Sequence, residues 1–155
     1  MKLLLVFLSS LLIFSGCSQI KGEVTHEYDE YLYQFNSDLV ALGYKPINFS
    51  DTIIYKSDEL KDAAGECVGG AMVKNEGHTV ILVKKSFDFA PAWAKKALIY
   101  HELGHCFLGL GHEEGTIMGA AMLPMVYSTG SSIMDDSRRF EELKAMLKNS
   151  SYWSL

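Results

Sequence analysis

The chain has 155 residues, of which 48% are hydrophobic and 21% are charged, a composition typical of one globular domain and not of a disordered or fibrous protein. Its net charge of -5 comes without any cluster of basic residues, so nucleic acid is not an expected partner. With 3 Pro and 13 Gly, collagen-like and Pro-rich classes are also excluded.

The first 16 residues predict an export signal. Lys2 precedes an apolar run from Leu3 to Phe14 that only Ser9 and Ser10 interrupt. About 12 residues suit the core of a signal peptide, whereas roughly 20 are needed for a helix that spans a bilayer. A short buried helix is the alternative, but the position of the run at the N-terminus favours the export signal.

The segment Ile13-Phe14-Ser15-Gly16-Cys17 resembles a bacterial lipobox, in which a small pair precedes a Cys that is acylated and becomes the first mature residue. The resemblance implies a lipoprotein of the bacterial cell envelope, held on a membrane through its lipid anchor. Ser18 follows the acylated Cys, a pattern that favours the outer membrane in Gram-negative lipoproteins. We therefore expect a signal peptide over 1–16, a lipidated tether over 17–25 and one folded domain over 26–155.

A helix and a strand are predicted in the first part of this domain. Over 26–42, apolar residues recur at i, i+3, i+4 and i+7, and Gly43 follows as the residue that ends the helix. The β-rich run 52–56 predicts a strand. The polar stretch 58–66 favours a loop or a helical turn.

The second part of the domain predicts a hairpin followed by two helices. Residues 71–74 and 78–84 are the expected arms of the hairpin, and 78–84 is the strongest strand signal in the chain. A helix is predicted over 92–108, where Gly109 ends it, and a closing amphipathic helix is predicted over 137–147.

A cluster of ligand-type residues lies at the end of the 92–108 helix, where residues 101–112 are HELGHCFLGLGH. His101 and His105 are four residues apart, which is about 400° of helical turn, so both imidazoles project from one face. Neutral imidazole is a good Zn²⁺ ligand. Glu102 lies about 100° round the helix from His101, where a general base for an activated water belongs.

A third histidine follows the helix. Gly109 and Gly111 allow the chain to turn and to bring back His112, so that three imidazoles leave a fourth position open, as in a catalytic zinc site. The alternative is a helix whose histidines are solvated or satisfied in the core. The other two histidines, His26 and His78, have no partner at ligand spacing and are interpreted as ordinary surface or strand residues.

This motif resembles the metzincin clan of zinc endopeptidases, whose usual pattern is HExxHxxGxxH. The chain has HExxHxxxGxxH, one residue longer, which is the spacing of archaemetzincins, but it lacks their cysteine-rich zinc motif. It is most similar to small bacterial lipoprotein-type metalloproteases with HELGHCxLGxxH and a later SIM. The resemblance covers mainly 93–135 and implies an α+β, zincin-like fold with a small mixed sheet packed on an N-terminal helix and an active-site helix.

Metzincins also have a Met-turn beneath the metal, for which the chain offers two candidates. Met134, in a Ser-Ile-Met sequence, is preferred, and Met118 is the alternative; simple apolar packing remains possible for either. Asp136 stands where some metzincins have a metal-contacting Tyr, and Tyr127 has no spacing argument. Asp135 or Asp136 is a candidate to orient a His ligand, with surface solvation as the alternative.

The two remaining cysteines predict a disulfide. Once Cys17 carries lipid, Cys67 and Cys106 are an even pair in an oxidising compartment. Two buried free thiols are the alternative.

Together these features predict a zinc metallopeptidase that acts on a protein or peptide substrate. His101, His105 and His112 are the expected Zn²⁺ ligands and Glu102 the expected general base. By analogy, strand 78–84 is expected to form the sheet edge that binds an extended peptide.

Two non-enzymatic alternatives stay open. One is a catalytically idle zinc-binding envelope lipoprotein that acts by binding or scaffolding. The intact Glu102 argues against it, because a purely structural metal site has no need of that carboxylate. The other is a structural lipoprotein with an accidental motif.

Overall fold

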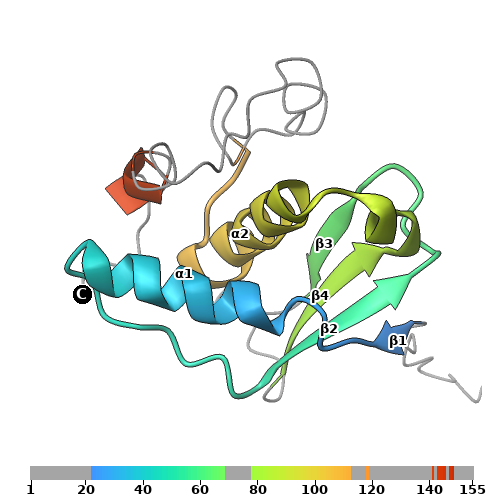
Figure 1. The fold of residues 1–155 in the computed structure, drawn as a ribbon, viewed down its shortest axis with the longest axis horizontal. Coiled ribbons are helices and arrows are strands. Elements are labelled where there is room, and N and C mark those ends of the chain that lie inside the picture. The colour runs from blue at the N-terminus through green and yellow to red at the C-terminus, as the bar shows by residue number, and fades with distance from the viewer. Residues whose placement is uncertain are drawn as a thin grey trace, which may run out of the picture.

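The computed structural model of the chain describes residues 22–68, 78–112 and 118, together with 141, 143–145 and 147–148 (Figure 1). The elements in chain order are β1 (Glu23–Val24), α1 (Asp29–Ala41), β2 (Thr52–Ser57), β3 (Gly65–Val68), β4 (Thr79–Lys84), the 3-10 helix η1 (Lys85–Phe89) and α2 (Ala92–Leu108). The described residues between 141 and 148 are helical, where the closing helix is predicted. The fold is therefore mixed α+β, as the sequence predicts.

Several predicted features lie outside the described residues. These are the export signal, the lipidation site Cys17, the first arm and the turn of the hairpin, Tyr127, Met134, Asp135 and Asp136. Among the residues that the structure does describe, no helix is long and apolar enough to cross a membrane.

The four strands form one mixed sheet in the order β1-β2-β4-β3. β2 and β4 run parallel, and β1 and β3 pair antiparallel with β2 and β4 respectively. β4 lies between two neighbours and buries Val80, Ile81 and Val83, which explains its nearly continuous apolar sequence. The prediction that this strand forms the edge of the sheet is therefore wrong.

The edge next to β4 is β3, which sequence patterning did not identify. Gly65 and Glu66 lie in the polar stretch 58–66, which predicts a loop or a helical turn. In the structure they instead pair with Val83 and Leu82 of β4. The four residues of β3 show no run of β-branched or aromatic side chains, so its pairing depends on β4 rather than on local preference.

Helix α2 packs against both α1 and β3. Its bounds, Ala92–Leu108, are those that the sequence predicts, and it ends at Gly109. Phe35 of α1 packs edge-on against Tyr100 of α2, with ring centroids 4.9 Å apart. Both helices share one apolar core with β2 and β4. Eleven side chains of α2 are buried: Ala94, Ala97, Leu98, Ile99, Tyr100, His101, Glu102, Leu103, Gly104, Cys106 and Leu108.

A disulfide joins β3 to α2. Cys67 and Cys106, the pair that the cysteine count predicts, are bonded, with their Cα atoms 5.6 Å apart and a sequence separation of 39. Closing a loop of that size stabilises a fold by roughly 3–4 kcal/mol on the chain-entropy model.

An ion-pair network fastens the entry to α1 to the sheet and to α2. The Glu27 carboxylate accepts hydrogen bonds from Lys56 of β2 and Lys95 of α2, both at 2.5 Å. Lys56 also pairs with Asp88 of η1 at 2.9 Å. The two lysines, Lys56 first, hold the pKa of Glu27 below its ordinary value, because they favour the charged carboxylate over the neutral form.

Glu27→Gln is expected to lower the free energy of unfolding by about 1 kcal/mol at pH 7, since this carboxylate is partly exposed. A carboxylate with a lowered pKa in the folded state stabilises the protein above its unfolded pKa, and this contribution is lost as the pH falls through the folded pKa. The difference in the free energy of unfolding between wild type and variant should therefore be greatest at pH 7 and should shrink below the ordinary carboxyl pKa of 4.5. Urea denaturation at a series of pH values measures it, with the exposed Asp62→Asn as control.

Candidate metal centre

Helix α2 places two histidines on one face, as their spacing predicts. His101 and His105 lie one turn apart, and their rings are edge-on with centroids separated by 4.5 Å. Their Nε2 atoms are 2.9 Å apart and so point at a common position. A tetrahedral zinc ion with bonds of about 2.0–2.1 Å needs ligand nitrogens roughly 3.3 Å apart, so a small opening of the two rings would fit one.

A left-handed turn at Gly109 brings the third histidine back. Gly109 has φ 64°, a conformation that glycine adopts without steric cost, and it ends the helix. The Leu110 N–H then donates to the Gly104 carbonyl at 3.1 Å, which folds the chain over the helix end. The His112 ring consequently lies 5.3 Å from that of His101 and 4.9 Å from that of His105, between centroids.

The three imidazoles form one cluster with a graded exposure. One ring nitrogen from each of His101, His105 and His112 lies within 4.8 Å of the others, a spacing that could hold a metal ion. His101 is buried, His105 is half-buried and His112 is exposed. The cluster is thus anchored in the domain on one side and open to solvent on the other.

The backbone also orients His105. Its Nδ1 lies 2.6 Å from the Leu110 carbonyl oxygen, to which the Nδ1–H donates, and this leaves Nε2 with its lone pair toward the cluster. Burial lowers the pKa of His105, the hydrogen bond to Leu110 opposes this, and His112 adds to the lowering. The neutral form, which is the one that binds metal, is therefore favoured.

Glu102, which follows His101 in sequence on α2, is buried and faces β3. Glu102 is only 3% exposed, and a methyl group at Gly65 would lie 2.7 Å from the Glu102 Oε1 atom. Burial, and to a smaller extent the Glu66 carboxylate, raise the pKa of Glu102 to about 8, although a hydrogen bond from the Cys67 backbone opposes the rise. A cation next to this carboxylate would favour its charged form.

The other predicted site residues are placed as follows. His26 bonds Asp29 at 2.8 Å and His78 is exposed; neither joins a convergent group of three potential ligands in the described ranges. Met118, the alternative Met-turn residue, is 1% exposed and belongs to the apolar core. Sequence reasoning missed Gly65 and the Leu110 carbonyl. The former is one glycine in a polar stretch, and the latter is a backbone group that no side-chain pattern reveals.

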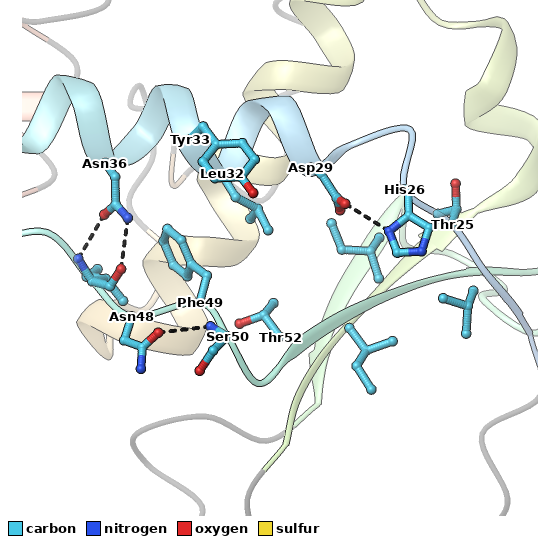
Figure 2. Close-up of a pocket in the computed structure, with 14 residues that line it drawn as sticks. Thr25, His26, Asp29, Leu32, Tyr33, Asn36, Asn48, Phe49, Ser50 and Thr52 are labelled. Atoms are coloured by element: carbon cyan, nitrogen blue, oxygen red, sulfur yellow. Dashed lines mark hydrogen bonds and ion pairs between the residues drawn. The ribbon is translucent and has the colours of Figure 1, made fainter.

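A separate pocket of about 640 Å³ lies between the first half of α1 and the start of β2 (Figure 2). Two of its lining residues are joined by hydrogen bonds: the Asn36 side chain donates to the Ile47 carbonyl and accepts from the Ile47 N–H, both at 2.8 Å. None of the three clustered histidines lines it. The three-histidine cluster at the end of α2 and this pocket are therefore separate features of the fold.

Comparisons of the chain with models of protein families, with curated proteins and with solved structures find no match. The interpretation of the site therefore depends on its own geometry.

The purified protein is expected to bind about one Zn²⁺ per chain through the three imidazoles. His112→Ala should weaken zinc binding by more than about 100-fold, because loss of a direct ligand should exceed the 10–100-fold cost of losing a supporting group. Competition with a chromophoric chelator measures the affinity, and His26→Ala serves as the matched control. Wild-type affinity in the His112 variant would contradict the three-histidine site.

Proposed function

We propose that the protein is a zinc-dependent endopeptidase of the metzincin type. The observation that carries the proposal is the convergence of His101, His105 and His112, and the helix that carries two of them also carries the buried Glu102. Three neutral nitrogen ligands with an open fourth position suit a catalytic zinc ion better than a structural one, which is closed by four protein ligands.

Zinc would supply a Lewis acid that activates water and polarises the scissile carbonyl. The hydrogen bond from His105 Nδ1–H to the Leu110 carbonyl keeps its Nε2 atom directed toward the metal position. Glu102 would accept the proton of the attacking water and pass it to the leaving amine. The exposed side at His112 is the direction from which a substrate would enter.

The free edge of β3 would bind the substrate backbone, in the role first expected for β4. The Lys84 N–H donates to the Ala64 carbonyl at 2.8 Å, so Ala64 faces β4. Backbone groups alternate in direction along a strand, and those of Gly65 and Cys67 consequently face away from β4, toward α2. An extended peptide could pair with the carbonyl groups of this edge beside the three histidines.

We further propose that the enzyme is a lipoprotein of the bacterial envelope, anchored through Cys17. The support is the apolar run that ends in a lipobox-like Ser-Gly-Cys sequence. Membrane attachment would restrict its protein substrates to those within reach of that surface.

Glu102→Gln should keep zinc and lose activity. Gln is nearly isosteric with Glu, so the helix and the imidazoles should stay in place, but Gln cannot accept a proton at neutral pH. General acid–base assistance is worth about 10²–10⁴ in rate, and we expect a loss of at least that order. Cleavage of a peptide library, with and without chelator, supplies the substrate, and zinc analysis supplies the control.

A variant that cuts the same substrate at the wild-type rate would contradict this mechanism. Zinc binding by both proteins without cleavage of any peptide would instead favour an idle zinc-binding lipoprotein.

Cys17→Ala should abolish lipid attachment, because this residue is the predicted acceptor at the end of the apolar run. Metabolic labelling with palmitate and membrane fractionation measure the effect, with Ser18→Ala as the neighbouring control. Continued labelling of the Cys17 variant would refute the assignment.

A further inference from the structure

The proposed general base lies against a strand position that has room only for hydrogen. A Cβ atom on Gly65 would be 2.7 Å from Oε1 of Glu102 and 3.0 Å from Cδ1 of Leu98. The first of these separations is shorter than a side chain tolerates, so one of the two groups would have to move. Glycine at this position therefore lets β3 approach α2 while the Glu102 carboxylate keeps its place.

The same strand also binds the carboxylate. The Cys67 N–H points away from β4, given the direction set by Ala64, and it donates a hydrogen bond to Glu102. Charge-assisted hydrogen bonds of this kind are stronger than neutral ones and fix direction as well as position. Gly65 and Cys67 thus contact Glu102 from two successive outward positions of one strand.

A covalent bond holds this strand in place. β3 has only four residues, and Glu66 and Val68 are exposed, so the strand buries little apolar surface of its own. The bridge from Cys67 reaches Cys106, which lies one helical turn beyond Glu102 on α2. Because Cys67 both forms the disulfide and donates the hydrogen bond to Glu102, the disulfide directly limits the position of the donating N–H.

We propose that β3 is the positioning element of Glu102: Gly65 makes room for the carboxylate, and the Cys67–Cys106 bridge fixes the N–H that holds it. This inference rests on the proposed peptidase function for its effect on rate. It implies that reduction of the bridge slows catalysis while the three histidines keep their metal.

Gly65→Ala is the first test, made on the full-length, zinc-loaded protein. The added methyl meets two flexible side-chain ends rather than backbone, so the fold should persist while the carboxylate moves. Zinc affinity and KM should stay near wild type and kcat should fall about 100-fold, the cost of a misplacement of roughly 1 Å. Val40→Ala, at an exposed position on α1, is the matched control and should keep wild-type kcat.

Hydrogen exchange of the Cys67 amide, followed by NMR, provides a second measurement that needs no substrate. This amide should be protected in wild type, and should exchange about 10-fold faster or more in Gly65→Ala and in Glu102→Ala, which remove its acceptor from reach. The Lys84 amide, which bonds Ala64, should stay protected and so report that the sheet is intact.

The double variant Cys67→Ala/Cys106→Ala tests the bridge. It keeps the backbone N–H at position 67 and removes only the covalent bond. We therefore expect unchanged zinc affinity, faster exchange of the amide at position 67 and a kcat lowered about 10-fold or more. Treatment of wild type with a phosphine reductant, which does not compete for the metal as dithiols do, should reproduce these changes.

Unchanged Cys67 amide protection in the Gly65 and double variants would overturn the proposal, as would faster exchange with wild-type kcat. Absence of any cleavage by wild type would overturn the peptidase function alone, because the amide measurement decides separately whether β3 holds Glu102.

Discussion

The left-handed turn at Gly109 is the constraint on which the three-histidine cluster depends. It ends α2 one turn after His105 and folds Leu110 back over the helix end. Both backbone groups of Leu110 are then used, the N–H by Gly104 and the carbonyl by His105. One turn therefore closes the helix, orients a ligand and returns His112, which explains how the cluster forms with one residue more than the usual metzincin spacing.

Burial makes the negative charge of Glu102 unfavourable on its own. The carboxylate is almost fully covered and lies near Glu66, and both conditions disfavour its negative charge. The Cys67 hydrogen bond offsets part of this cost. A divalent cation between the imidazoles would offset more, so the proposed metal and the buried acid favour each other. A purely structural role for the helix gives no reason for this carboxylate.

Features set by local sequence were predictable, and features set by distant contacts were not. The C-terminal bound of α2 follows from Gly109, which ends the helix, and the shared face of His101 and His105 follows from the period of 3.6 residues. The place of 78–84 inside the sheet depends on β3, whose short polar sequence has no strand signal. The roles of Gly65 and Leu110 depend on contacts across the fold, which no periodicity encodes.

The site therefore combines two elements with different physical origins. Helix α2 is held by apolar packing on most of its surface, which fixes the backbone that carries His101 and His105. β3 is a short edge strand that is held by pairing with β4 and by one covalent bond to α2. That bond ends on the helix that carries His101 and His105. It therefore fixes the position of β3 relative to these histidines directly, without depending on the rest of the core. An oxidising compartment, which the predicted export signal would provide, is the setting in which such an arrangement persists.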